Sequence, residues 1–137
     1  MILIIHTADQ SQVLLALAKA SKLIAQKRFK AQYQQGEKLL LAIDDLLQAK
    51  NYKLKAIKGI AVISGPGPFT ALRIGVATAN TLAWALGVPI IGIKLNEFQD
   101  LDQLAAVAEK KIKKASAGKI IEPFYDKEPN ITKRRLS

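Results

Sequence analysis

The stretch over residues 62–93 constrains the fold more than any other part of this sequence. It reads VISGPGPFTALRIGVATANTLAWALGVPIIGI. An apolar strand predicted over 56–64 enters a turn rich in glycine and proline, a helix follows over 70–86, and a second apolar strand follows over 89–93. The helix is expected to stop at Gly87. Two strands joined by one helix predict a right-handed parallel crossover.

The other predicted elements complete a mixed sheet covered by helices. The opening run MILII suits a central strand that is buried on both faces, and residues 13–18 and 23–30 are predicted to follow it as an antiparallel meander. Residues 37–50 and 101–114 carry apolar side chains at helical spacing. In the C-terminal segment, Ile120, Ile121, Phe124 and Tyr125 are expected to dock on the core, whereas the last residues are not. We therefore predict an α/β fold whose first three strands are antiparallel and whose fourth and fifth strands are parallel, with helices packed on the sheet.

Composition excludes several kinds of site. The 137 residues include no cysteine and one histidine, His6, so disulfides, thiol catalysis, cysteine-ligated metals and two-histidine zinc sites are excluded. The net charge is +10. Nine basic and five acidic residues fall within 101–137, so the excess is spread along the chain. Such a charge favours nucleic acid or acidic partners through nonspecific attraction, or simply forms a solvated surface.

No segment is predicted to enter a membrane. MILII has no basic stretch before it, which is unlike a signal peptide. The most apolar segment, 74–93, carries Thr78, Asn80 and Thr81, and glycine and proline interrupt it near its end. We therefore expect a soluble, cytoplasmic protein without a membrane partner.

The turn over residues 65–69 does not match the known phosphate-binding loops. GPGPFTALR has no lysine where a GxxxxGK[ST] loop needs one, and Thr70 stands where GxGxxG needs glycine. Its two prolines remove backbone donors. Arg73 opposes the helix dipole, so we expect it to brace the turn or to meet an acidic group of this chain or of a partner. The motif residues with a predicted structural role are Gly65, Pro66, Gly67, Phe69, Thr70 and Arg73.

The helix over 70–86 has small residues at every fourth position and almost no polar face. A helix that is apolar nearly all round is buried on more than one side. We expect the helix over 37–50 to lie on the small-residue row, and the surplus apolar surface to contact another protein. In the alternative, the helix over 101–114 covers that surface. The predicted partner-binding residues are Leu40, Leu41, Ile43, Leu47, Ala71, Leu72, Gly75, Ala79, Leu82 and Ala83.

Several of these segments resemble the TsaB family of bacterial tRNA threonylcarbamoyladenosine synthesis. GPGPFTALRIG is similar to that family's GPGSFTGLRIG, and GVPIIGI to the strand that follows. MILIIHTAD resembles its first strand, GEKLLLAIDDLL its first helix, and PFYDKEPNIT its closing segment. The resemblance covers about residues 1–97 and 120–132. It implies an actin-like, ribonuclease-H-like lobe over 1–97, with a short helix and a basic tail over 98–137 in place of a second lobe.

The resemblance also implies a function. Members of the TsaB family are non-catalytic scaffold subunits that pair with the catalytic subunit TsaD, and with themselves, through the two helices that correspond to 37–50 and 70–86. With the ATPase TsaE, the complex transfers a threonylcarbamoyl group to adenosine 37 of tRNA. The resemblance thus implies a TsaD-like partner, a possible homodimer, indirect contact with a TsaE-like ATPase, tRNA bound through the complex, and no cofactor.

The chain departs from the family pattern at several positions. His6 stands where the family often has aspartate, Ala8 replaces serine, and Pro68 and Ala71 replace serine and glycine in the main motif. A carboxylate at the end of the first strand holds a metal and nucleotide in actin-like folds. His6 therefore argues against ATP binding.

Two other function classes stay open. A nucleotide-binding or peptidase-like enzyme would rely on His6, Asp9, Thr70 or Arg73. A basic tRNA-binding accessory protein would use the cationic residues of the C-terminal region, although no aromatic residue for base stacking stands among them. Those residues are Lys110, Lys111, Lys113, Lys114, Lys133, Arg134 and Arg135.

Overall fold

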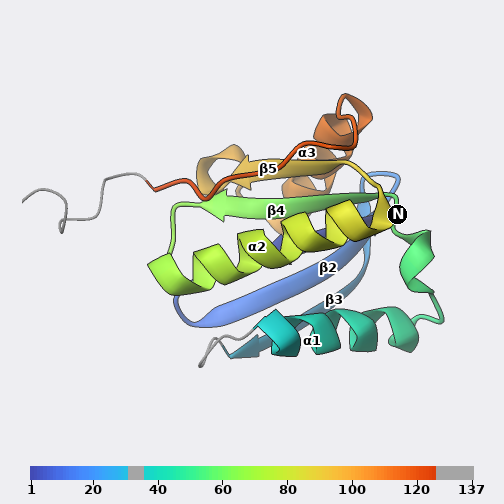
Figure 1. Cartoon of the computed structure of the whole chain (residues 1–137), viewed down its shortest axis with the longest axis horizontal. Helices are drawn as coiled ribbons and strands as arrows, with labels where there is room; N and C mark the ends of the chain where they lie inside the picture. Colours follow the sequence, from blue (N-terminus) through green and yellow to red (C-terminus); the bar gives the residue numbers. More distant parts are fainter. Residues whose placement is uncertain (31–35, 126–137) are drawn as a thin grey trace, which may run out of the picture.

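The computed structural model describes residues 1–30 and 36–125. Five strands form one sheet in the order β3-β2-β1-β4-β5. β1 pairs antiparallel with β2 and parallel with β4, while β2–β3 is antiparallel and β4–β5 is parallel. This is the predicted mixed sheet (Figure 1). The strands are β1 (Ile2–His6), β2 (Gln12–Lys19), β3 (Lys22–Lys30), β4 (Gly59–Gly65) and β5 (Ile90–Lys94).

Helices cover both faces of the sheet. In Figure 1, α1 and α2 lie side by side over one face, and α3 lies on the other. The described residues also form two short 3₁₀ turns. The elements are α1 (Gly36–Ala49), α2 (Phe69–Leu86), α3 (Leu101–Lys113), η1 (Leu54–Ala56) and η2 (Leu95–Glu97).

The central strands β1 and β4 are buried on both faces, which explains their unbroken apolar sequence. Leu3 and Ile5 belong to the core cluster shared with α1 and α2. Ile2 and Ile4 point the other way, into the cluster shared with α3. Because side chains alternate along a strand, one short run such as ILII supplies two core layers.

The predicted elements are confirmed, with small shifts at their ends and one larger shift at the start of β4. α2 stops at Leu86 because Gly87 adopts a left-handed conformation with φ 68°. The strand predicted to start at residue 56 starts at Gly59 instead. Residues 54–56 form η1, in which Lys55 is exposed. At the start of the strand, a Cβ on Gly59 would lie 2.8 Å from Ile112 Cδ1 of α3, so α3 packs closely there.

The predicted helix over 101–114 does not cover α2. α3 packs on the opposite face of the sheet, so that alternative is wrong. The extended segment 119–125 flanks α2 instead, and the Asn80 side chain holds it through two hydrogen bonds. Asn80 Nδ2 donates to the Ile121 carbonyl at 2.8 Å, and the Ile121 amide donates to Asn80 Oδ1 at 2.9 Å.

The C-terminal segment docks largely as predicted. Ile121 and Tyr125 pack against the two core clusters, and the Phe124 amide donates to the Ser64 carbonyl at 2.7 Å. Ile120 was also expected to dock, and that is wrong, since it is 73% exposed. The neighbouring Ile121 is partly buried against the core, so only one of these two isoleucines contacts it. The prediction that the last residues do not dock falls outside the described part of the chain.

The small-residue row of α2 is only partly the groove that we expected. α1 and α2 share one core cluster that includes Ala79 and Ala83, so they are neighbours as predicted. Gly75, however, meets the end of the sheet: a Cβ there would contact Thr7 Oγ1 and lie 2.8 Å from Thr7 Cγ2. Thr7 is buried. The absence of a side chain at Gly75 therefore lets α2 pack closely on the end of β1.

Within the described residues, no helix is long and apolar enough to cross a membrane.

We predict that Gly75→Ala destabilises the protein by about 1–3 kcal/mol, because a methyl group would overpack the contact with Thr7. This reverses the usual gain of roughly 0.5–1 kcal/mol for this change inside a helix. Urea denaturation would measure the change in the free energy of unfolding. Thr7→Ala should recover part of the stability in the double variant. A Gly75→Ala variant as stable as the parent would contradict the close packing.

We also predict that Asn80→Ala frees the segment 119–125, because two backbone groups of Ile121 would then have no partner. The expected cost is about 1–3 kcal/mol. Trypsin should then cut faster at Lys119. Thr81→Ala is the matched control, because Thr81 is the next residue of α2 and is exposed. Equal cleavage rates in the two variants would show that Asn80 does not hold the segment.

Candidate functional site

The outward face of α2 is the most prominent functional candidate on the surface. Its exposed residues follow the helical spacing of three and four that defines one face. Ile74 lies half-buried beside them. A shallow pocket on this face is lined by Thr70, Arg73, Ile74 and Ala77. The exposed residues of the face are Thr70, Arg73, Ala77, Thr81 and Trp84.

Two aromatic side chains lie near the ends of this face. Trp84 is 85% exposed and Phe69 is 46% exposed. The Phe69 ring stacks on Tyr125 with centroids 5.1 Å apart, and the Arg73 guanidinium lies 5.1 Å from the Phe69 centroid. The Arg73 side chain therefore lies over the first residue of α2, and the bracing role expected for it remains a prediction. Trp84 leaves a large apolar ring in water.

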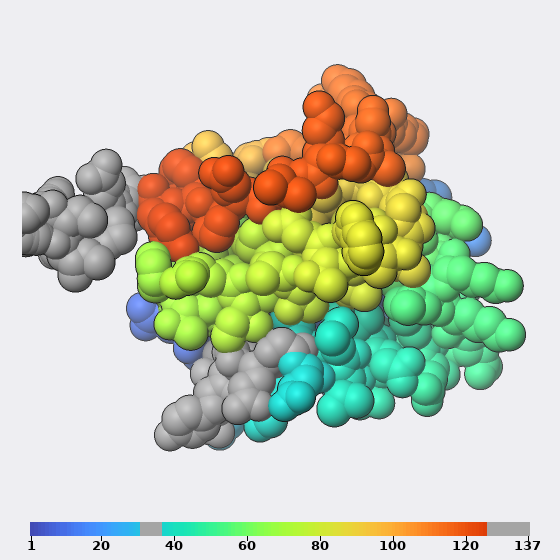
Figure 2. Space-filling model, in the orientation of Figure 1, coloured from blue at the N-terminus to red at the C-terminus, as the bar shows by residue number. Residues whose placement is uncertain are grey.

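α1 extends the apolar surface. Figure 2 shows α2 between α1 and the C-terminal segment on one side of the molecule. On α1, Leu41 is 65% exposed and Leu40 is 44% exposed. Asp44, Asp45 and Gln48 are among its exposed polar residues. We call Leu40, Leu41, Phe69, Ile74, Ala77 and Trp84 the α1–α2 surface.

Most of the predicted partner-binding residues lie inside the chain's own core. Only Leu40 and Leu41 are exposed, and Ala71 is half-buried. Contact of the remaining seven with a partner remains a prediction. In the folded chain they are buried beneath the exposed faces of α1 and α2. These buried residues are Ile43, Leu47, Leu72, Gly75, Ala79, Leu82 and Ala83.

The glycine- and proline-rich motif lies at a junction of three segments. Gly65 has φ 135°, a conformation that favours glycine, and a side chain there would meet Phe124 and Leu72. A Cβ at Gly67 would lie 2.6 Å from the Ala8 carbonyl oxygen. The motif loop thus packs against the β1–β2 loop and the C-terminal segment. Pro66 and Pro68 complete the corner, and Pro68 is the residue that precedes α2.

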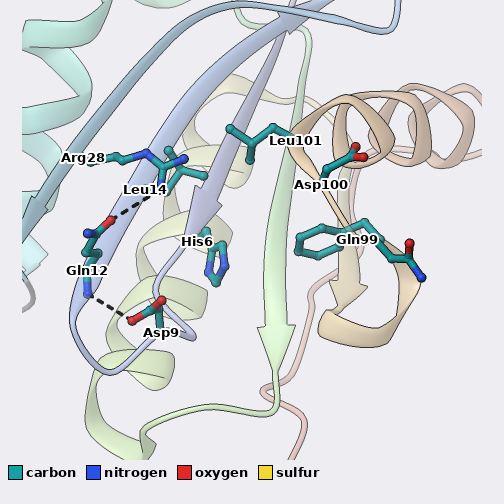
Figure 3. Close-up of a pocket in the computed structure, with 9 residues that line it drawn as sticks. His6, Asp9, Gln12, Leu14, Arg28, Gln99, Asp100 and Leu101 are labelled. Atoms are coloured by element: carbon teal, nitrogen blue, oxygen red, sulfur yellow. Dashed lines mark hydrogen bonds between the residues drawn. The ribbon is translucent and has the colours of Figure 1, made fainter.

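A second pocket lies at the carboxyl end of β1, where α/β sheets commonly bind ligands. Figure 3 shows that its labelled side chains come from β1, the β1–β2 loop, β2 and β3, and from the segment that leads into the start of α3. Arg28 Nη1 donates to Gln12 Oε1 at 3.4 Å. The lining residues are His6, Asp9, Gln12, Leu14, Arg28, Phe98, Gln99, Asp100 and Leu101.

The titratable groups of this pocket take part in local structure. His6 Nδ1 accepts a hydrogen bond from the Ala8 amide at 3.2 Å. Burial lowers the pKa of His6, and the nearby Asp9 charge offsets part of that effect. Asp9 accepts from the Ser11 amide at 2.6 Å and from the Ser11 hydroxyl at 2.8 Å, and these bonds lower the pKa of the Asp9 carboxyl.

The four residues that an enzyme would need lie at two different places. His6 and Asp9 line the pocket at the end of β1, whereas Thr70 and Arg73 line the shallow pocket on α2. His6 also contacts Phe98 edge-on, with ring centroids 6.3 Å apart. The structure therefore does not bring this set together.

The sequence-based site missed the exposed aromatics. Trp84 belongs to the apolar residues of α2 that were expected to be buried, yet it lies on the outer side of the helix. The pattern of apolar residues along α2 does not indicate which face of the helix is exposed, because nearly every position is apolar or small. The stacking of Phe69 on Tyr125 joins residues far apart in the sequence, so no local signal predicts it.

A family model and a curated relative that match this chain carry the same description. The family model described as TsaD, tRNA N6-adenosine threonylcarbamoyltransferase, matches residues 30–101, which is 72 of the 137 residues. A tRNA N6-adenosine threonylcarbamoyltransferase from Geotalea uraniireducens is 46% identical over 57 residues, 42% of this chain and 17% of that protein. The chain thus spans about a sixth of the length of this curated relative.

Solved structures agree on the fold. YeaZ from Pseudomonas aeruginosa superposes with a TM-score of 0.61 and 27% identity, over 68% of this chain and 43% of that one. RuvC from T. thermophilus, solved with a Holliday junction substrate, superposes with a TM-score of 0.56 and 11% identity, over 85% of this chain and 98% of that one. The fold is therefore the predicted actin-like, ribonuclease-H-like one. With more than half of its residues matched by the family model, this chain belongs to the TsaD family, and within that family it is similar to TsaB (YeaZ), as its motifs indicated.

Proposed function

We propose that this chain is a non-catalytic scaffold subunit of tRNA threonylcarbamoyladenosine synthesis, which binds a TsaD-like catalytic subunit, or a second copy of itself, through the α1–α2 surface. The observation that carries this proposal is the exposure of Trp84, Leu41 and Phe69 on adjacent helices. We infer the process, tRNA threonylcarbamoyladenosine synthesis, from family membership. We infer the mode of partner binding from the exposed α1–α2 surface.

The surface has the make-up of a protein interface. Tryptophan is prominent among the residues that contribute most to binding, and arginine is enriched there too. Trp84 and Arg73 both lie on the outward face of α2. Contiguous exposed apolar patches on folded proteins commonly mark interaction sites. The acidic Asp44 and Asp45 of α1 give the surface a polar rim on one side.

The arrangement of the two pockets supports a structural rather than a catalytic role. His6, whose neutral form is favoured by burial, accepts a hydrogen bond from its own loop, and Asp9 holds the Ser11 turn. The glycine motif packs against neighbouring segments. In this proposal the catalytic groups come from the TsaD-like partner, and tRNA and a TsaE-like ATPase join through the complex.

We predict that Trp84→Asp and Leu41→Asp each weaken the pairing by at least tenfold, since truncating a buried interface anchor costs about 2 kcal/mol or more. Co-expression with a TsaD-like subunit, followed by size-exclusion chromatography and light scattering, would measure both heterodimer and homodimer. Folding should be unchanged because both side chains are exposed.

Leu54→Asp is the matched control for this experiment. Leu54 is 44% exposed, the same fraction as Leu40, but it lies in η1, outside the α1–α2 surface. Its replacement should leave pairing intact. If the parent protein pairs with neither partner, or if Leu54→Asp weakens pairing as much as Trp84→Asp, the assignment of this surface fails.

The nucleotide-binding alternative has its own test. Titration calorimetry with ATP and magnesium should give no saturable heat with the folded chain, because His6 replaces the carboxylate expected to hold the metal in this fold. The measurement should be repeated with His6→Asp to restore that carboxylate. Saturable heat with the parent protein that His6→Ala abolishes would instead assign the pocket at the end of β1 to a nucleotide.

A further inference from the structure

The fold gathers lysines at the amino end of the parallel strands. β1 and β4 begin together there, since Ile2 lies opposite Gly59. The β2–β3 hairpin closes at the same end, because Ala18 lies opposite Ile2 and Lys19 pairs with Lys22. The hairpin therefore presents two lysines beside the starts of the central strands.

Two helices and a loop bring further lysines to this end. α1 ends there and η1 follows it, next to the N-terminus in Figure 1. The Lys58 amide donates to the Met1 carbonyl at 2.8 Å. α3 also ends there, because a Cβ on Gly59 would lie 2.8 Å from Ile112 Cδ1. We call the resulting set the basic pole: Lys19, Lys22, Lys50, Lys53, Lys55, Lys58, Lys113 and Lys114.

The basic pole is exposed and poorly compensated. All eight lysines are exposed. Among the described acidic residues, Glu109 lies beside the pole, with one carboxylate oxygen 3.9 Å from Lys113 Nζ. The other carboxylates lie toward the carboxyl end of the strands or along α1. These are Asp9, Glu37, Asp44, Asp45, Glu97, Asp100, Asp102 and Glu122.

We propose that the basic pole binds the phosphate backbone of RNA. An uncompensated cluster of lysines attracts polyanions and releases their counterions on binding. The cluster spreads over a sheet about 20 Å wide, given a strand spacing of roughly 4.8 Å, so it can meet several phosphates at once. The lysines come from a hairpin, a loop and two helix ends, unlike the single amphipathic helix that lies on a membrane surface.

The basic pole lies close to the Trp84 end of the α1–α2 surface, so it can bind RNA within the assembled complex. α2 ends at Leu86 and β5 begins at Ile90, so α2 also ends at the amino end of the strands. Trp84 therefore lies near the basic pole. The identification of the RNA as the tRNA substrate of the complex rests on the proposed function, whereas the attraction to phosphates does not.

The test uses the full chain without a partner. Fluorescence anisotropy would measure its binding to a tRNA transcript and to an unrelated RNA of the same length, from 50 to 200 mM salt. We expect similar affinities for both RNAs and a linear fall of log K with log salt. Lys22→Glu/Lys55→Glu should weaken binding at 50 mM salt at least tenfold. It should also reduce the slope by about 1.4–1.8, since each phosphate that the protein neutralises adds roughly 0.7–0.9.

Lys30→Glu/Lys38→Glu is the charge-matched control. Both of its lysines are exposed, one at the end of β3 and the other at the start of α1, away from the pole. It should retain most of the affinity. An equal loss of affinity in both double variants would show that net charge alone, and not the position of the lysines, determines RNA binding, and it would overturn the proposal. An absence of RNA binding at 50 mM salt would also overturn it.

Vesicles of 30% phosphatidylserine in phosphatidylcholine complete the experiment. Vesicle binding that exceeds RNA binding at the same salt, and that Lys22→Glu/Lys55→Glu removes, would assign the pole to a lipid surface and overturn the RNA proposal. Because this assay contains no partner protein, its failure leaves the scaffold proposal standing. Conversely, a failed pairing experiment with Trp84→Asp leaves RNA binding by the pole intact.

Discussion

The burial of β1 and β4 on both faces is the constraint on which the rest of the structure depends. Strands with no polar face require a helical layer on each side. The chain meets this requirement with α1 and α2 on one face and α3 on the other. Since α1 and α2 share one face, each turns only part of its circumference to the core. The apolar residues on their outer sides remain in water, which produces the α1–α2 surface.

The glycine- and proline-rich motif fixes how α2 sits on this core. Gly67 admits the Ala8 carbonyl and Gly75 admits Thr7, so the motif and the helix both pack closely on the end of β1. On the other side of the motif, the Ser64 carbonyl accepts a hydrogen bond from the Phe124 amide. The glycine- and proline-rich turn is thus packed against other segments of the same chain. These contacts help to set the orientation of α2, and with it the outward direction of Trp84.

The two surfaces proposed to act in assembly and in RNA binding differ in chemistry, and they approach each other near Trp84. The α1–α2 surface is apolar with an aromatic anchor, which suits a protein partner. The basic pole is cationic and lacks aromatic stacking residues among its members, which suits a phosphate backbone without base recognition. A scaffold with this arrangement could hold a catalytic partner and the backbone of its RNA substrate at neighbouring positions, while contributing no reactive group.

The sequence by itself determined the strands, the helices, the parallel crossover and the family, because each of these is written in local patterns: apolar runs, helical spacing, the stop at Gly87 and the GPGPFTALRIG motif. Only the tertiary structure decided which side of each element meets water. It buried Gly75 against Thr7, exposed Trp84 and Ile120, and collected lysines that are scattered along the chain at one end of the sheet. The physical reason is that burial and charge density depend on contacts between distant segments, and a nearly all-apolar helix carries no local record of the face that will remain uncovered.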